Sequence, residues 1–288
     1  MQKILMLTNT VDGTADILVD KLDSMKIKVF RWNIDLWQKY KILFNDYGFK
    51  IIDPNGYEIT SSEKPTLLWR KPFVDLMSFE GLELVDTDIT FAKVQVRQLL
   101  NSIVAMVNDY KGVKLIDPQA ELRLPKLYQL QIAQNFFNTL PFEFSFHTSN
   151  EYIADKYITK PLGNPALGSK IMYTVRVEPS ELFRPYPWLL QKAITGGTDV
   201  TCVYINGESH FFECDYKRSD KSIDWRTEIN TEGQAKWHPL VNDKLTELKK
   251  STFNLMEKFK LHYGRLDFIR EGNNFFFLEC NPNGQFGW

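Results

Sequence analysis

The sequence has little of the residue types that build disulfide frameworks, metal clusters or nucleophilic triads. It contains three cysteines, Cys202, Cys214 and Cys280, and four histidines among 288 residues. The cysteines are too few and too scattered for a disulfide framework or a Cys-x-x-Cys metal site, so we expect buried free thiols in a reducing compartment. The histidines have no metal-binding spacing, and we find no Ser-His or Cys-His arrangement. The sequence therefore favours chemistry without a covalent enzyme nucleophile.

The chain also lacks a strong net charge and a long apolar run. Its formal net charge is −1, so no global basic field attracts a polyphosphate backbone, and we expect no nucleic-acid partner. The N-terminal apolar run covers only Ile4 to Leu7, which is typical of a first strand and not of a signal peptide. No stretch is long enough to span a bilayer, so we expect a cytoplasmic protein without a membrane partner.

The beginning of the chain predicts a small α/β domain of the doubly wound type. A strand at 3–8, helical spacing over 17–25 and a strand at 28–32 follow one another. The loop after the first strand, Asn9 to Thr14, has neither G-x-G-x-x-G nor G-x-x-x-x-G-K-[ST]. The usual Rossmann or P-loop phosphate site is therefore not expected there.

The remaining pattern alternates short strands with a few helices. Asp53-Pro-Asn-Gly predicts a hairpin between 49–52 and 57–59. Helical spacing predicts helices at 89–109, 124–137 and 244–259. Further strands are expected at 66–70, 157–160, 171–177, 188–193, 198–205 and 210–215, followed by a terminal hairpin of 264–269 and 275–280.

The terminal hairpin carries the strongest chemical signal. Alternation along a strand places Arg265 and Asp267 on one face, and it predicts that Phe277, Glu279 and Asn281 share a face on the returning strand. Two carboxylates and an amide oxygen can then converge, and these are the oxygen ligands that Mg²⁺ prefers beside substrate phosphates. The alternative is a solvated strand face that happens to be acidic.

Two further signals are weaker when taken alone. Lys160 ends a strand directly before a loop with Gly163, Gly168 and Ser169, where a lysine and backbone N–H groups can approach phosphate oxygens. Gln191 lies inside an apolar segment, where a buried amide could read an adenine edge. A solvated lysine and an ordinary strand glutamine are the alternatives.

The order of these pieces resembles that of the ATP-grasp superfamily. Lys126 precedes a helix, and a strand ends in Ile158-Thr-Lys-Pro before the glycine loop. Leu190-Gln-Lys-Ala-Ile is followed by Asp199, and the chain closes on Leu266-Asp-Phe-Ile and Phe277-Leu-Glu-Cys-Asn-Pro-Asn-Gly-Gln.

More narrowly, the whole chain resembles the microviridin-type or graspetide ligases, which are ATP-grasp maturases of ribosomally made peptides. The features are Leu68-Trp-Arg-Lys-Pro, Ile116-Asp-Pro, Leu124-Pro-Lys-Leu-Tyr-Gln-Leu and Asp224-Trp-Arg. The resemblance implies an α/β ATP-grasp fold in three parts. These are an N-terminal Rossmann-like pre-ATP-grasp domain at 1–120, a central subdomain with the phosphate-covering glycine loop at 121–190, and a C-terminal subdomain with the magnesium site at 191–288.

The resemblance also implies a role for each matching residue. Lys126 and Lys160 would contact the phosphates of ATP. Gln191, with the backbone of Lys192 and Ala193, would hold the adenine, and Asp199 would hold the ribose. Asp267, Glu279 and Asn281 would hold Mg²⁺, and Asp224 and Arg226 would engage the precursor peptide.

One position departs from the family pattern of acid, aliphatic residue and arginine. This chain reads Asp199-Val-Thr, so Thr201 stands where an arginine is expected near the transferring phosphoryl group. Positive charge stabilises that group in the transition state. Arg265 and Arg176 are the candidates to replace it, and we hypothesise that Arg265 does so.

The implied reaction transfers the γ-phosphoryl of ATP to an Asp or Glu side chain of the precursor peptide. A hydroxyl or amine of the same peptide then attacks and forms an ester or amide cross-link. One alternative is a ligase that adds a free amino acid to a peptide or another amino acid. Another is a catalytically impaired scaffold that binds nucleotide and peptide. The resemblance further implies a possible homodimer.

Overall fold

The computed structural model describes residues 3–110, 116–145, 157–162, 166–167, 170–171, 174–176, 188–217 and 236–285. The chain divides into two compact units, Met1–Gln119 with Asn283–Trp288, and Ala120–Pro282. The predicted peptide-binding residues Asp224 and Arg226 lie outside the described residues, as do Gly163, Gly168 and Ser169 of the glycine loop. The division into three parts at 120 and 190 stays a prediction.

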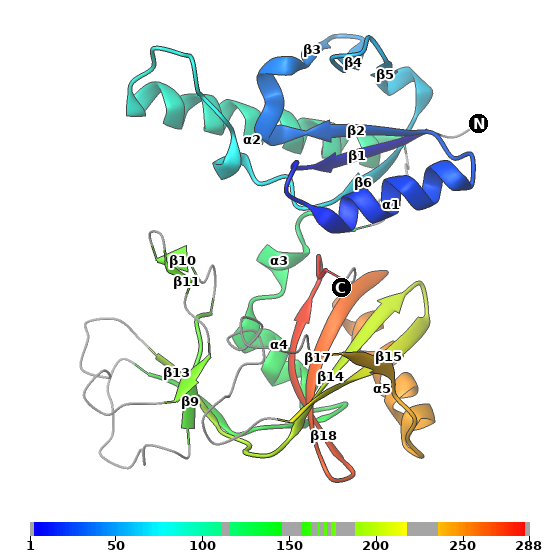
Figure 1. Ribbon diagram of the computed structural model, residues 1–288, viewed down its shortest axis with the longest axis vertical. Coiled ribbons are helices and arrows are strands. Elements are labelled where there is room, and N and C mark those ends of the chain that lie inside the picture. Colours follow the sequence, from blue (N-terminus) through cyan, green and yellow to red (C-terminus); the bar gives the residue numbers. More distant parts are fainter. Residues whose placement is uncertain are drawn as a thin grey trace. The chain divides into compact units, whose positions relative to one another are not determined.

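A parallel sheet forms the centre of the first unit. Its order is β2-β1-β6, from β1 (Ile4–Thr8), β2 (Val29–Asn33) and β6 (Thr66–Trp69). Every residue of β1 is buried, as expected for a strand that is covered on both faces. The helices of this unit are α1 (Gly13–Ser24) and α2 (Asp86–Asp109), with short 3₁₀ segments η1 (Ile34–Lys39), η2 (Ser61–Glu63) and η3 (Val74–Leu76) (Figure 1). The predicted strand–helix–strand beginning is confirmed.

Helix α2 covers the apolar core of this unit. Its Leu100, Ile103, Val104 and Val107 pack in one cluster with side chains of β1 and β6. Their spacing of three and four residues is that of one helix face, which is the pattern that predicted the helix. Helix α1 buries only Thr14 and Ala15, and its Ile17 is 54% exposed.

A second, antiparallel sheet of the first unit contains β3 (Lys41–Asn45), β4 (Gly48–Ile52) and β5 (Glu58–Thr60). The predicted hairpin around Asp53-Pro-Asn-Gly is confirmed, since Ile51 of β4 pairs with Ile59 of β5. Strand β3 was not predicted. None of its residues is fully buried, so it lacks the regular apolar alternation that marks a half-buried strand.

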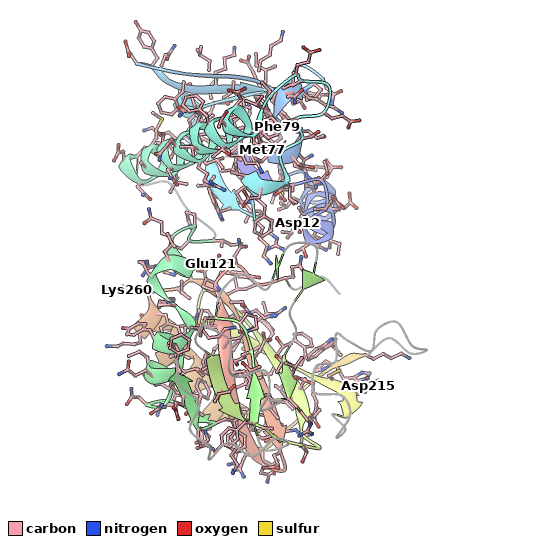
Figure 2. The ribbon with its side chains drawn as sticks, turned by 90° about the vertical axis from the view of Figure 1, so that its left-hand side faces the viewer. Asp12, Met77, Phe79, Glu121, Asp215 and Lys260 are labelled. Atoms are coloured by element: carbon pink, nitrogen blue, oxygen red, sulfur yellow. The ribbon has the colours of Figure 1, made fainter. Side chains whose placement is uncertain are left out.

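A buried ion pair holds together distant parts of the first unit. Arg70 is fully buried, and its Nε lies 3.2 Å from Oδ2 of Asp12. Asp12, which is labelled in Figure 2, caps α1 by accepting from the N–H of Ala15. The other edge of the Arg70 guanidinium donates to the carbonyl and the Oδ1 of Asn283, at 3.3 and 3.0 Å. The residue that follows Asn281-Pro282 is therefore anchored in the first unit.

The described residues of the second unit form two larger sheets, a two-stranded sheet and three helices. One sheet has the order β12-β9-β13-β8, and the other has the order β16-β15-β14-β17-β18-β7. The first contains β8 (Phe142–Ser145), β9 (Tyr157–Thr159), β12 (Val175–Arg176) and β13 (Trp188–Lys192). The second contains β7 (Asn138–Thr139), β14 (Thr198–Ile205), β15 (Glu208–Lys217), β16 (Trp237–Pro239), β17 (Tyr263–Glu271) and β18 (Asn274–Asn281). The helices are α3 (Ala120–Arg123), α4 (Lys126–Ala133) and α5 (Leu245–Phe259).

Two of the elements predicted for the second unit differ from those observed, and α3, β7, β8, β10 (Ala166–Leu167) and β16 were not predicted. The helix predicted over 124–137 is shorter, because α4 ends at Ala133 after beginning behind Pro125. The strand predicted over 171–177 corresponds to two short strands in different sheets. Strand β11 (Lys170–Ile171) pairs with β10, and β12 pairs with β9.

Tight turns join the long hairpins of the six-stranded sheet. Asn206 and Gly207 join β14 to β15 with φ angles of +46° and +96°, which an Asn-Gly turn adopts readily. Strands β14, β17 and β18 are neighbours in the sheet (Figure 1). Residues of β14, β17 and β18 share one apolar cluster with Leu248, Leu255 and Phe259 of α5. Among the described helices, none has the length and apolar character needed to cross a membrane.

Candidate active site

Three neighbouring strands bring the predicted acidic residues together. Thr201 of β14 lies opposite Asp267 of β17, and Asp267 lies opposite Glu279 of β18. Residues directly opposite each other in an antiparallel pair project from the same face of the sheet. The convergence that alternation predicted for Asp267 and Glu279 is therefore present.

A β-bulge at Leu278 corrects one part of that prediction. Asp267 pairs with Glu279, whereas the next residue, Phe268, pairs with Phe277, so β18 has one extra residue. Phe277 consequently packs against Phe268 in the core, with ring centroids 5.8 Å apart. The expectation that Phe277 shares the face of Glu279 was wrong, because the bulge shifts the alternation by one residue.

The Asn281 amide connects the two carboxylates. Its Nδ2 donates to Oδ2 of Asp267 at 3.1 Å and to Oε1 of Glu279 at 3.2 Å. The two carboxylates and the amide thus occupy one small volume. Among the described residues, no group of three or more His, Cys, Asp or Glu side chains is placed to hold a metal ion, so this set depends on Asn281 as its third member.

Both oxygens of Asp267 have additional partners. Thr201 Oγ1 donates to Oδ1 at 3.0 Å, and Arg265 Nη2 lies 2.9 Å from Oδ2. Partial burial raises the pKa of Asp267, and the charge of Glu279 adds to this effect. Arg265 acts to lower this pKa by its charge and its hydrogen bond, and Thr201 acts to lower it by its hydrogen bond.

Glu279 has the opposite electrostatic environment. Burial alone would raise its pKa, but the charges of Lys126 and Lys160 and the hydrogen bonds from Lys126 and Asn281 lower the pKa to about 2. Lys126 Nζ lies 3.0 Å from Oε2 of Glu279 and also donates to the carbonyl of Pro161 at 3.1 Å. The Asp267 and Glu279 side chains keep 23% and 24% of their surface exposed, so solutes can reach both.

The predicted adenine-binding segment lies on β13. Gln191 is fully buried between β8 and β9, and neither Nε2 nor Oε1 has a hydrogen-bond partner among the described residues. A buried amide without hydrogen-bond partners destabilises the folded protein unless a ligand supplies those partners. The N–H of Lys192 donates to the carbonyl of Pro141 at 2.9 Å, so a backbone contact from Lys192 would use its carbonyl.

Other predicted residues lie on nearby elements of the second unit. Asp199 is buried on β14, two residues before Thr201, and alternation therefore places it on the same face. Lys160 directly follows β9. Arg176 lies on β12, opposite Ile158 of β9, in the other sheet from Asp267. The roles of these residues remain predictions.

An open hollow borders Lys126. It has a volume of about 590 Å³, and its lining includes Lys126, Tyr128, Phe142, Phe144 and Leu162. The side chains come from α4, from β8 and from the segment after Lys160. Since most of this lining is apolar, the hollow has room for a ring or an aliphatic group beside the lysine. Nothing in the local sequence pattern had indicated it.

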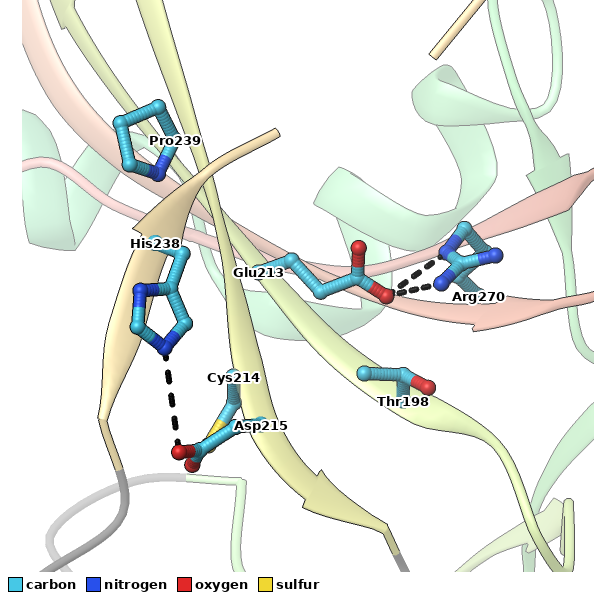
Figure 3. A pocket seen from close by; sticks show the side chains of 7 residues that line it. All are labelled: Thr198, Glu213, Cys214, Asp215, His238, Pro239 and Arg270. Carbon is cyan, nitrogen blue, oxygen red and sulfur yellow. Dashed lines mark hydrogen bonds and ion pairs between the residues drawn. The ribbon is translucent and has the colours of Figure 1, made fainter. Parts of the chain in front are cut away.

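A second hollow, of about 240 Å³, lies on strands β14 to β17 (Figure 3). Its polar side chains contact one another in pairs. Arg270 Nε lies 3.0 Å from Oε1 of Glu213, and His238 Nε2 lies 3.8 Å from Oδ2 of Asp215. Because these polar side chains already contact one another, this hollow is a weaker candidate than the site around Asp267.

Comparison with known proteins identifies the fold. No family model and no curated protein matches the sequence. A RiPP-associated ATP-grasp ligase from Chryseobacterium gregarium, solved with ADP and a leader and core peptide, has 20% identity and a TM-score of 0.80 over 99% of this chain and 90% of that chain. The macrocyclase MdnC from Microcystis aeruginosa, solved with the precursor peptide MdnA, has 19% identity and a TM-score of 0.78 over 99% and 92% of the two chains. The ATP-grasp ligase PsnB with minimal precursor, Mg and ADP has 13% identity and a TM-score of 0.70 over 98% and 89%. This chain has the ATP-grasp fold, as the motifs predicted.

Proposed function

We propose that this protein is an ATP- and Mg²⁺-dependent ligase that modifies a ribosomally made precursor peptide. The observation that carries the proposal is the convergence of Asp267, Glu279 and Asn281 with Lys126 in an ATP-grasp fold. The structural neighbours support the choice of substrate class, since they were solved with leader, core or precursor peptides.

The residues present fit the nucleotide. The Gln191 amide has an unpaired donor and an unpaired acceptor, which is the complement that an adenine edge requires. Lys126 and Lys160 both act electrostatically on Glu279, so two cations lie beside the proposed position of the phosphate oxygens. Asp199 on the same face of β14 would accept from ribose hydroxyls.

The same residues fit Mg²⁺. Two partly exposed carboxylates are within hydrogen-bonding reach of one amide, and Mg²⁺ prefers such oxygen donors when it also binds phosphates. The Asn281 amide would turn so that its oxygen replaces its nitrogen. When bound, Mg²⁺ would neutralise the β- and γ-phosphate oxygens.

The proposed reaction proceeds in two balanced steps. A carboxylate oxygen of a peptide Asp or Glu attacks the γ-phosphorus of ATP, the bond to the β,γ-bridging oxygen breaks, and ADP leaves. A hydroxyl or amine of the same peptide then attacks the acyl phosphate, losing its proton to solvent and expelling phosphate. Each cross-link consumes one ATP and removes one water from the peptide.

Arg265 would supply the positive charge that the family pattern places at position 201. Its guanidinium lies 2.9 Å from Asp267, on the strand next to Thr201, so a short side-chain movement would bring it to a phosphate bound at Asp267. A cation there lowers the barrier by stabilising charge that develops in the transition state. Arg176 is the alternative source.

Peptide-dependent ADP release tests the proposal. The probe is a short peptide with repeated Thr or Ser and Asp, Glu or Lys, encoded beside the gene for this chain. We expect ADP release that requires Mg²⁺ and the peptide, and its loss in an Asp267→Asn, Glu279→Gln variant. Nucleotide binding without ADP release would support the impaired scaffold, which Thr201 would explain. Release that also requires a free amino acid would support the amino-acid ligase.

A further inference from the structure

Helix α4 places two side chains against β18, one turn apart. Lys126 is its first residue, and its Nζ lies 3.0 Å from the Glu279 carboxylate. Gln129 follows three residues later on the same helix face, and its Oε1 accepts a hydrogen bond of 2.7 Å from the N–H of Cys280. The helix therefore contacts both the side chain of Glu279 and the backbone of the next residue.

The Gln129 amide is fixed at both ends. Its Nε2 donates to the carbonyl of Leu124 at 2.7 Å, and the residue is only 5% exposed. With the donor and the acceptor both engaged, the amide has one preferred orientation. A buried side chain in this state can fix the position of its backbone partner, whereas a freely rotating one cannot.

The end of β18 explains why Cys280 needs such a partner. Strand β7 pairs with β18 only at Phe276 and Phe277, and the bulge at Leu278 follows. Cys280 lies beyond this pairing and is 2% exposed. A buried N–H without an acceptor is unfavourable, so the Gln129 side chain supplies the acceptor that a neighbouring strand would otherwise provide.

Cys280 lies between Glu279 and Asn281, so its backbone position sets the direction of both side chains. We propose that Gln129 is a positioning residue, which holds the backbone of Cys280 so that Glu279 and Asn281 stay in register with Asp267 for a magnesium-bound nucleotide. This inference rests on the proposed function. It assigns α4 two tasks: Lys126 balances the charge of Glu279, and Gln129 fixes the geometry of the oxygen set.

Calorimetric ADP binding with Mg²⁺ and with EDTA tests this role. Replacing a group that orients a metal ligand commonly weakens metal binding about 10- to 100-fold. We expect Gln129→Leu to lose about tenfold or more of the Mg²⁺-dependent gain in ADP affinity, while ADP affinity in EDTA stays within about twofold of wild type. Gln134→Leu, at the exposed end of the same helix, should retain both affinities.

Hydrogen exchange provides the direct readout of the backbone contact. The Cys280 amide should exchange faster in Gln129→Leu than in wild type, and Gln134→Leu should leave it unchanged. If Gln129→Leu does not fold, Gln129→Asn keeps the amide but shortens its reach by one methylene, and the same losses are expected.

The outcomes separate this inference from the proposed function. Wild-type protein that binds ADP equally with Mg²⁺ and with EDTA would overturn both. Wild-type protein with a Mg²⁺-dependent gain that Gln129→Leu or Gln129→Asn retains would overturn only the role of Gln129. If Gln129→Leu lowers Tm and weakens ADP binding equally with Mg²⁺ and with EDTA, Gln129 contributes to packing only, and the proposed role is also overturned.

Discussion

The hydroxyl of Thr201 donates a hydrogen bond of 3.0 Å to Oδ1 of Asp267, directly across from β14 to β17. The position where the family pattern has an arginine therefore holds a neutral donor on one oxygen of this carboxylate. The cation is Arg265, which lies 2.9 Å from the other oxygen, Oδ2. We propose that this charge on β17 takes the place of the arginine that the family pattern has on β14.

Exchanging the two side chains should test this relocation. We expect Arg265→Ala to lower the rate of peptide-dependent ADP release about 100-fold or more, as removal of one transition-state donor commonly does. Thr201→Arg in the same variant should recover a substantial part of that loss. Arg270→Ala, on the same strand but paired with Glu213, is the control. Unchanged turnover in Arg265→Ala would mean that another cation serves the phosphoryl group.

Glu279 should make stability dependent on pH in the acidic range. Its pKa is lowered from 4.5 to about 2. Its contribution to the free energy of unfolding is therefore fully present above pH 4.5 and is lost as the pH falls towards 2. We expect the free energy of unfolding of wild type to fall by roughly 1 to 2 kcal/mol more than that of Glu279→Gln between pH 5 and pH 3. Denaturant unfolding at several pH values measures this, with Glu271→Gln at the exposed end of β17 as control. Parallel curves for wild type and Glu279→Gln would contradict the predicted electrostatics.

Gln191 should favour nucleotide binding at the expense of stability. Its buried amide has no partner in the described part of the chain, so Gln191→Leu removes unpaired polar atoms from the interior. We expect a Tm equal to or above that of wild type and an affinity for ADP about tenfold lower, which corresponds to about 1.4 kcal/mol. Thermal unfolding and calorimetry give the two values. A lower Tm together with normal affinity would assign the amide a structural role.

Arg70 should be important for the stability of the first unit. Arg70→Ala leaves Asp12 buried without its cation, and removing one partner of a buried pair costs about 3–5 kcal/mol. Arg97→Ala removes an exposed pair with Asp75 and should cost less than about 1 kcal/mol. Denaturant unfolding of the two variants compares them. Similar losses would show that burial does not strengthen the Arg70 pair.

The sequence predicted those parts of the site that depend on local periodicity. Alternation along two strands was enough to predict that Asp267 and Glu279 lie on one face. The bulge at Leu278 was missed because a Leu-Glu-Cys segment contains no glycine or other marker of an extra residue. The expected orientation of Phe277 failed for that reason alone.

Contacts between distant segments could not be predicted from one sequence. Gln129 and Cys280 are 151 residues apart, and Arg70 and Asn283 are 213 residues apart. Each contact depends on how helices and strands pack, and no local propensity encodes that arrangement. Strand β3 was missed for a different reason, because its largely exposed residues leave no periodic apolar signal.

The most direct test of the proposed activity is the mass of the peptide after incubation with the protein, ATP and Mg²⁺. The proposed ligase predicts that the peptide encoded beside its gene loses one water for each ADP released, and that Asp267→Asn, Glu279→Gln abolishes both changes. A peptide of unchanged mass without ADP release, or one that gains the mass of an amino acid, would contradict it.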